Sequence, residues 1–531
     1  MKVNVFTLWK NLAWPDVKIT QPLPIGEGVL DASGFRALEV DQLFESLNHT
    51  STNIGQAVLF QSLTQPLDKL HNIEDKQRAV EELQTNATLR AMVESIVSSA
   101  AIHETHFYQL LFADFLPMFD TAKNEQQIEG YGYLQYRRGV HFIQTLISQV
   151  QACPEPESDY LRSLFDQIKG FSGSRVYALM TQAVYLTETA LLSKQEKRKA
   201  WWQPAIVFHA RLFKPLLIGL MAAALGALIF FMPFIVNEAI FFTPFLLLYL
   251  PLVGGFDRDH FILPLRDLFK QSPELAVTMD ALGQLDELLS FVNFSERFPH
   301  ETVMPSMIES EQHRMVLCQA INPVLGNMNE HYIGNDLQLD HQKLLLITGP
   351  NSGGKTAFCK TIAQIQLLAQ IGCVVPARSA TLSVADKIFY QTPEISRLQD
   401  GEGRFGAELK RTKDIFLATS ARSLVILDEL SEGTTFEEKM ESSMTVLKGF
   451  YRKGSSTILI THNHQLVDGL LAEHLGVAKQ VEFLNEAPTH KIIDGISRVS
   501  HADRVAKKIG FSQQDIDDYF SAASSASQNH S

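Results

Sequence analysis

A glycine-rich segment in the second half of the chain has the residue types and spacing of a phosphate-binding loop. It follows an apolar run at 344–348 and precedes a helix-compatible run, and its residues are Gly349, Pro350, Asn351, Ser352, Gly353, Gly354, Lys355 and Thr356. Glycines let backbone N–H groups turn towards phosphate oxygens, and a helix N-terminus adds a positive dipole. We therefore expect ATP here, with the Lys355 ammonium on its β- and γ-phosphates and the Thr356 hydroxyl on Mg²⁺.

Three further polar residues follow apolar runs in the same part of the chain. Asp428 and Glu429 come directly after the run 424–427, and His462 comes after the run 457–461. Asp428 is expected in the Mg²⁺ shell, Glu429 is expected to orient or polarise the attacking water, and His462 is expected to sense the γ-phosphate. An acidic pair can also merely cap the next helix, and a lone histidine can be structural. The upstream loop favours Lys355, Glu429 and His462 as catalytic residues.

The elements that position these residues differ between the two halves of the chain. Beyond about residue 311, short aliphatic runs alternate with helical segments, which predicts a P-loop ATPase domain with a mostly parallel sheet. Earlier segments have helical periodicity, as at Ile143, Leu146, Ile147 and Val150. The predicted fold class is therefore α + α/β.

An apolar stretch interrupts the helical part. Residues 215–235 carry no charge, and a second apolar run, 239–256, follows after three residues. At about 1.5 Å per residue the first run spans a hydrocarbon core of roughly 30 Å. Basic residues flank both sides, so we expect a transmembrane hairpin in the cytoplasmic membrane, with two spans and both flanking parts in the cytoplasm. A buried helical pair in a large core is the alternative.

These patterns divide the chain into six predicted parts. They are an unassigned N-terminal segment (1–40), a helical domain (41–204), a two-helix membrane hairpin in contact with lipid (205–256), returning helices (257–310), the ATPase domain (311–515) and a disordered tail (516–531). No cleaved signal peptide is expected, because the N-terminus lacks a continuous apolar stretch.

Composition limits the function classes. The 531 residues carry a formal net charge of −13, which excludes a globally basic nucleic-acid coat but leaves room for a local basic patch such as Lys410, Arg411 and Lys413. Four cysteines without a CxxC motif are typical of reduced thiols rather than of a disulfide or metal framework.

Several motifs in the right order resemble the MutS family of DNA mismatch-repair ATPases. In the C-terminal part they are TGPNSGGKT (348–356), QIGCVVPA (370–377), GEGRFGAEL (401–409), LVILDELSEGTT (424–435), ITH (460–462) and SHADRVAKKIGF (500–511). The short motifs Asn322–Leu325 and Gly334–Asp336 also sit where the family has similar ones. Residues 43–67 and 76–83 resemble the start of the family's helical lever domain.

The resemblance implies an ATPase that uses ATP and Mg²⁺ and works as a homodimer through its ATPase domains. In the family a signature segment of one subunit completes the nucleotide site of the other, and the corresponding residues here are Gly403, Arg404, Phe405 and Glu408. It also implies an association with mismatched or branched DNA.

Departures from the family pattern bear on this expectation. The lever motif begins near residue 41, so the chain is expected to be a truncated, membrane-anchored member without mismatch-binding and connector domains. A serine expected near Gly403 is missing and Glu432 stands where a basic residue is common, so hydrolysis is expected to be slow. The alternatives are a membrane mechanochemical or sensor ATPase that does not bind DNA, a nucleotide-binding scaffold, and a role for an unknown protein partner.

Overall fold

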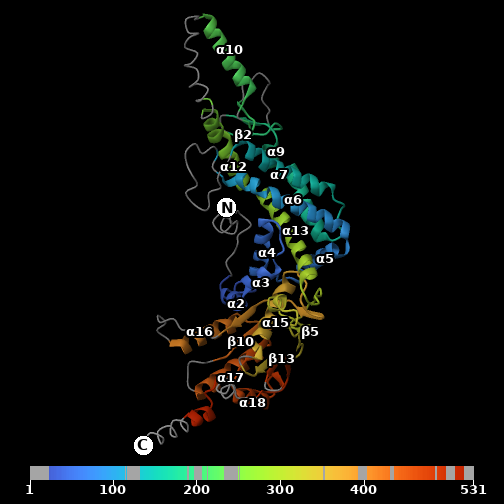
Figure 1. The fold of residues 1–531 in the computed structure, drawn as a ribbon, viewed down its shortest axis with the longest axis vertical. Coiled ribbons are helices and arrows are strands. Elements are labelled where there is room, and N and C mark those ends of the chain that lie inside the picture. The colour runs from blue at the N-terminus through green and yellow to red at the C-terminus, as the bar shows by residue number, and fades with distance from the viewer. Residues whose placement is uncertain are drawn as a thin grey trace, which may run out of the picture. The chain divides into compact units, whose positions relative to one another are not determined.

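The computed structural model describes 23–113, 115, 132–187, 190–196, 206–211, 213–231, 249, 252–350, 353–392, 403–430, 436–484, 487–497 and 509–519. Its backbone divides into two compact units. Unit 1 contains 48–61 and 78–293, and unit 2 contains 20–47, 62–77 and 294–531, together with residues outside the described set. Figure 1 shows the elements of both units with their labels.

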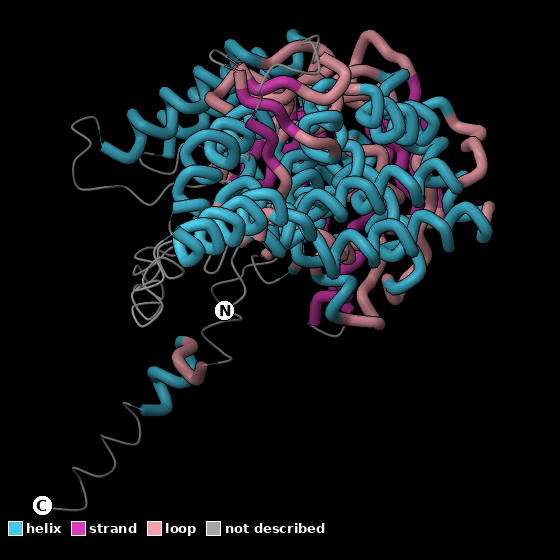
Figure 2. The backbone as a smooth tube through the Cα atoms, turned by 90° about the horizontal axis from the view of Figure 1, so that it is seen from above, coloured by secondary structure: helices cyan, strands magenta, loops and turns pink. Residues whose placement is uncertain are grey.

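Unit 1 is mainly helical, as the cyan tube of Figure 2 shows for much of the chain. Its helices are α6 (Ala87–Phe112), α7 (Tyr133–Ala152), α8 (Asp159–Gly170), α9 (Arg175–Thr181), α10 (Pro215–Phe231), the π-helical turn Arg258–Ile262 and α12 (Leu263–Lys270). Three more helices have residues in both units: α4 (Asn53–Thr64), α5 (Leu70–Thr85) and α13 (Pro273–Arg297).

Close packing of α6 against α7 forms much of the core of unit 1. The predicted helical periodicity is seen in α7, where Ile143, Leu146, Ile147 and Val150 are all buried. A Cβ atom at Gly139 would lie 2.7 Å from the carbonyl oxygen of His106, so only glycine fits between these helices at that point. The apolar stripe of α7 is therefore buried as its spacing requires.

A small antiparallel sheet, β2-β1-β3, also belongs to unit 1. Its strands are β1 (Val184–Leu186), β2 (Leu191–Leu192) and β3 (Ile206–Phe208). The periodicity analysis predicted no strand before residue 205. Strands of two or three residues are too short to show a period-two alternation, and this explains the difference.

The apolar stretch requires a correction. Among the described residues, no helix has both the length and the apolar character to cross a membrane. Of the first predicted span, residues 215–231 are described and form α10, and 232–235 lie outside the described residues. The second predicted span, 239–256, lies outside the described residues except at 249 and 252–256. The predicted localisation in the cytoplasmic membrane is wrong, and the transmembrane hairpin over 205–256 and its contact with lipid are not supported.

Buried polar contacts hold the segment before α10 to the helical turn at 258–262. The Asp257 carboxylate, which is fully buried, accepts from the Lys214 ammonium at 2.6 Å and from the Tyr133 hydroxyl at 2.7 Å. The Tyr249 hydroxyl accepts from the Lys214 backbone N–H at 3.3 Å. Burial and the Asp257 carboxylate both raise the pKa of Tyr133, so its hydroxyl stays a donor.

Unit 2 is built on two sheets. The larger has the order β13-β12-β7-β11-β10-β9, and all its neighbours are parallel except β12 and β13. Its strands are β7 (Leu344–Thr348), β9 (Ile388–Gln391), β10 (Leu424–Asp428), β11 (Ser456–Ile460), β12 (Val477–Leu484) and β13 (Ala487–Asp494). The smaller has the order β4-β8-β5-β6, with β4 (Ser306–Ile308), β5 (Met315–Ala320), β6 (Asn335–Leu339) and β8 (Ser379–Ser383).

Four helices of unit 2 lie between strands of the larger sheet along the chain: α15 (Lys355–Gln370), α16 (Gly403–Ala418), α17 (Phe436–Lys453) and α18 (His464–Ala472). Three shorter ones, α2 (Ala32–Ala37), α3 (Val40–Leu47) and α14 (Leu325–Met328), come earlier in the chain. Strands β7 and β11 are buried along their whole length, as expected of parallel strands covered on both faces. The predicted combination of a helical part with an α/β part is confirmed. Residues 513–519 are helical, at the start of the segment predicted to be disordered.

A segment from the N-terminal part of the chain completes the edge of the larger sheet. Leu30 forms a parallel bridge with Ile388 of β9. The Lys387 ammonium donates to the carbonyl oxygens of Gly26 and Gly28, and the Arg411 guanidinium pairs with the buried Asp31 at 3.0 Å. Residues 23–47, mostly within the segment left unassigned from the sequence, therefore belong to unit 2.

Candidate nucleotide site

The predicted phosphate-binding loop joins β7 to α15. Gly349 and Gly354 have φ values of +132° and +92°, a region that favours glycine. A Cβ atom at Gly353 would lie 2.9 Å from Val481 Cγ2, so the loop also needs glycine for space. Asn351 and Ser352 lie outside the described residues. The sequence therefore folds here into a strand, a tight loop and the first turn of a helix, as the spacing predicts.

Lys355 is the first residue of α15, and its side chain is buried. Its ammonium group donates to the carbonyl oxygen of Gly349, which closes the loop on itself. Burial lowers the pKa of Lys355, while the carboxylates of Glu429 and Asp428 act in the opposite direction. The ammonium thus sits at the base of a loop of backbone N–H groups, where a phosphate would meet concentrated positive charge.

Thr356 and Asp428 come together from different elements. The Thr356 hydroxyl donates to Asp428 Oδ2 at 3.3 Å, and Asp428 is the last residue of β10. Strand β11 lies between β7 and β10, and all three are parallel. Their carboxyl ends therefore share one edge of the sheet, which places a hydroxyl and a carboxylate oxygen side by side.

Glu429 follows Asp428 in a left-handed conformation, with φ of +57°. Its backbone N–H donates to the carbonyl oxygen of Ile460 at 3.0 Å. Its carboxylate accepts from the Thr461 hydroxyl at 3.3 Å and from the backbone N–H of His462 at 3.1 Å. His462 Nε2 lies 3.6 Å from Glu429 Oε1. The end of β11 therefore orients this carboxylate.

The structure adds residues that the sequence reasoning did not assign to the site. His490 of β13 has φ of +60°, and its Nδ1 would lie 3.3 Å from a Cβ atom at Gly354. The Asn335 carboxamide donates to the His490 carbonyl oxygen at 3.0 Å and accepts from the Ile492 N–H at 2.7 Å. The motif Gly334–Asp336 was a signal for Asn335, whereas no local pattern marks His490 or Val481.

The predicted signature residues lie on α16. Gly403 and Arg404 begin the helix, Phe405 is half-buried, and Glu408 is buried. Residues 393–402 and 431–435, which include Glu432, lie outside the described residues. Arg411, part of the basic cluster proposed for DNA, is engaged with Asp31. The structure thus gathers Lys355, Thr356, Asp428, Glu429 and His462 at one sheet edge and places the signature residues on a separate helix.

Comparisons with known proteins match both parts of the chain. Residues 30–292 match the family model of MutS domain III, and residues 345–524 match that of MutS domain V. A DNA mismatch repair protein MutS from Brevibacillus brevis is 31% identical over 258 residues, which are 46% of this chain and 29% of that protein.

Longer but weaker similarity extends over most of the chain. A DNA mismatch repair protein MutS from Chlorobium chlorochromatii is 26% identical over 507 residues, covering 88% of this chain and 57% of that protein. A shorter match, to a DNA mismatch repair protein MutS from Thermotoga maritima, is 28% identical over 255 residues, or 46% of this chain and 32% of that protein. In each case the matched region spans less than two thirds of the relative.

Proposed function

Because this chain belongs to the MutS family, we propose that it is an ATPase related to DNA mismatch repair. The observation that carries the proposal is the convergence of the Thr356 hydroxyl, the Asp428 carboxylate and the Glu429 carboxylate beside the glycine loop. Thr356 follows β7 and the loop, whereas Asp428 and Glu429 stand at the end of the parallel strand β10. These residue types suit phosphoryl transfer to water.

The residues present fit ATP with Mg²⁺. Oxygen ligands suit this hard cation, which is usually held by one or two protein groups together with substrate phosphates. Thr356 and Asp428 supply two such oxygens 3.3 Å apart. At Gly353 a Cβ atom would collide with Val481, so the loop can pack against β12 only with glycine at this position. Bound Mg²⁺ would neutralise charge on the β- and γ-phosphates.

Each residue of the site then has a defined task. The Lys355 ammonium exchanges its contact with the Gly349 carbonyl for phosphate oxygens, and Thr356 and Asp428 hold the cation. Glu429, oriented by Thr461 and the His462 backbone, holds the attacking water and accepts its proton. The His462 imidazole, 40% exposed, faces the same space and contacts the γ-phosphate.

We further propose a homodimer in which α16 of one subunit completes the nucleotide site of the other. Gly403, Arg404, Phe405 and Glu408 are the residues proposed for this contact. ATP bridging two subunits would favour a closed dimer over the form that ADP allows, and this difference would move the helical domain. The missing serine near Gly403 supports slow turnover.

DNA is the proposed effector of this ATPase. The similar proteins are DNA mismatch repair proteins, and this supports the proposal for the present chain. The net charge of −13 requires local contacts rather than a general basic surface. Lys410 and Lys413 flank Arg411 on α16 and are the proposed basic residues.

The decisive experiment is steady-state ATP hydrolysis by the full chain, with and without duplex, mismatched and branched DNA at two salt concentrations. Glu429→Gln should abolish turnover yet keep bound nucleotide, and Lys355→Ala should lose nucleotide binding. The matched control is Glu437→Gln, which changes an exposed carboxylate in the first turn of α17.

The outcomes separate the parts of the proposal. If the hydrolysis rate depends on Glu429 but is the same with and without each DNA, the proposed ATPase activity stands and the proposed DNA association is rejected. Nucleotide binding without turnover in the unmodified chain would reject the hydrolase and leave a nucleotide-binding scaffold. Unchanged binding in Lys355→Ala would reject the site itself.

A further inference from the structure

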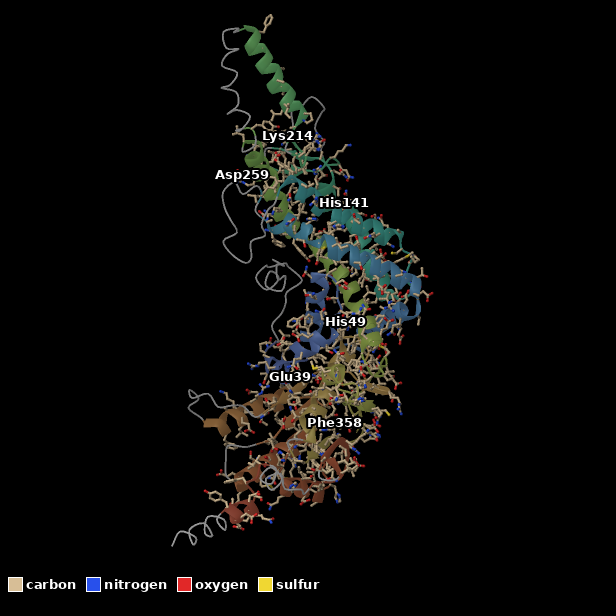
Figure 3. All side chains as sticks on the ribbon, viewed as in Figure 1. Glu39, His49, His141, Lys214, Asp259 and Phe358 are labelled. Carbon is tan, nitrogen blue, oxygen red and sulfur yellow. The ribbon has the colours of Figure 1, made fainter. Side chains whose placement is uncertain are left out.

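A cavity of about 730 Å³ lies in unit 1, away from the glycine loop in sequence and in a different compact unit. It opens to solvent and is lined by the N-terminal half of α7, the end of α9 with the residues that follow it, the start of β1, and the end of β3 with the segment after it. We name it the α7/α9 cavity. Figure 3 labels His141, one of its lining residues, on α7. Ligand pockets have volumes of roughly 300 to 1,000 Å³, so this one has room for an organic molecule.

Cationic and hydrogen-bonding side chains line one part of the cavity. Arg137 and His141 are four residues apart on α7 and therefore lie on the same face of that helix. His209 and Arg211 come from the segment after β3, where the Arg211 N–H donates to the His209 carbonyl oxygen at 2.7 Å. This contact holds the two residues in a tight turn.

Negative charge is missing from the lining. None of the lining residues is Asp or Glu. In the part of the chain that the structure describes, neither Arg137 nor Arg211 forms an ion pair with a carboxylate. Two arginines on separate elements thus line one hollow, and no carboxylate among the described residues is paired with either. Guanidinium groups bind phosphate oxygens in bidentate fashion.

The floor of the cavity is apolar and partly aromatic. Tyr136 and Phe208 pack edge to face, with ring centroids 5.8 Å apart, and Val140 and Leu179 lie beside them. All four are buried. Burial raises the pKa of Tyr136, so its hydroxyl adds no negative charge at neutral pH. Inorganic phosphate would make no favourable contact with these apolar side chains, whereas a ligand with an apolar body would pack on them.

We propose that the α7/α9 cavity binds a small organic phosphate, with its phosphoryl group between Arg137 and Arg211 and its apolar or aromatic body on Tyr136 and Phe208. The apolar floor beside the arginines favours a small molecule with an apolar body over a nucleic-acid backbone, which would need the guanidinium groups but not the floor. The inference is independent of the proposed ATPase function, since no residue is shared.

Fluorescence anisotropy with N-methylanthraniloyl-AMP tests the site in the full chain. The chain carries Lys355→Ala, so that the glycine loop does not compete for the probe. We expect saturable binding with one probe per chain. The corresponding uncharged adenosine derivative should bind about tenfold more weakly or worse, because it lacks the charge-assisted hydrogen bonds.

Three variants assign the binding to residues. Arg137→Gln and Arg211→Gln should each lower the affinity for the probe by about tenfold. Arg138→Gln is the matched control, because Arg138 is the next exposed arginine on α7 but lines a different cavity, with His103 and His106. All three side chains are exposed, so the variants are expected to fold, and circular dichroism checks this.

The contrary results are distinct. Absence of saturable binding, or equal losses in Arg138→Gln and Arg137→Gln, would overturn the proposal. A competition experiment compares unlabelled AMP with a single-stranded oligonucleotide of ten nucleotides. If the oligonucleotide displaces the probe at a far lower concentration than AMP does, the occupant is nucleic acid and the proposal is overturned. Displacement by AMP with the oligonucleotide no better would support it.

Discussion

The Thr356 hydroxyl lies 3.3 Å from Asp428 Oδ2, although 72 residues separate them in the chain. Thr356 is the second residue of α15, directly behind the glycine loop, and Asp428 is the last residue of β10. The contact exists because β7, β11 and β10 are parallel neighbours whose carboxyl ends coincide. It marks the position where a divalent cation would join the protein to a nucleotide.

This contact predicts which variants lose dependence on Mg²⁺. Asp428→Asn and Thr356→Ala should each abolish the gain in ATP affinity on adding Mg²⁺, while retaining weak metal-free binding through Lys355 and the loop. Calorimetric titration with and without Mg²⁺ measures this gain. Thr356→Ser keeps the hydroxyl and serves as the control. An undiminished Mg²⁺ effect in Asp428→Asn would remove that carboxylate from the cation shell.

The Asn335 side chain is expected to hold His490 beside the loop. Its carboxamide is buried and bridges the His490 carbonyl oxygen and the Ile492 N–H. Asn335→Ala should destabilise the hairpin formed by β12 and β13, because a buried polar group that loses its partner costs about 1 to 3 kcal/mol. Nucleotide affinity should fall severalfold, and His490→Ala should produce a similar fall. Equilibrium nucleotide titration checks both, and normal affinity in both variants would separate the hairpin from the site.

Stability of unit 1 should decrease as the pH rises towards neutrality because of Glu104. Burial raises the pKa of this carboxyl from 4.5 to about 7, although it accepts from the Asn53 N–H at 3.0 Å. The folded state therefore binds a proton that the unfolded state releases between pH 4.5 and 7. The stability present below pH 4.5 is lost through this window, by on the order of 3 kcal/mol.

Glu104→Gln tests this pH dependence, because glutamine resembles the protonated acid and does not titrate. Urea unfolding between pH 5 and 8 should show a flatter stability profile for this variant than for the unmodified protein. Glu81→Gln changes an exposed residue of α5 and should keep the original profile. Parallel profiles for all three proteins would show that Glu104 does not titrate in this range.

The buried Asp257 carboxylate is expected to stabilise the region next to α10. Asp257→Ala leaves the partly exposed Lys214 ammonium and the buried Tyr133 hydroxyl without their common acceptor, and a buried group that loses its partner costs about 1 to 3 kcal/mol. Asp259→Asn, two residues away, removes an exposed pair with Arg258 and should leave unfolding unchanged. Denaturant unfolding of the two variants distinguishes them, and equal midpoints would assign no stabilising role to Asp257.

The sequence alone determined the glycine-rich loop between β7 and α15 and the residues that follow the strands of the larger sheet. The loop, the start of the helix and the ends of the strands are local features of the sequence. Because parallel strands bring their carboxyl ends to one edge of the sheet, Lys355, Asp428 and Glu429 could be predicted to lie close together. Likewise, the periodicity of α7 identified its buried face. The family followed from the order of several such motifs.

Only the tertiary structure decided the features that depend on contacts between distant segments. The place of His490 beside Gly354 follows from the pairing of β12 with β13, and the place of residues 23–47 follows from the bridge between Leu30 and Ile388. The hydropathy of 215–235 reported apolar length alone and led to the wrong localisation, since no helix among the described residues is both long and apolar enough to cross a membrane. Local sequence encodes periodicity and turn geometry, whereas which distant surfaces meet is decided by packing of the whole chain.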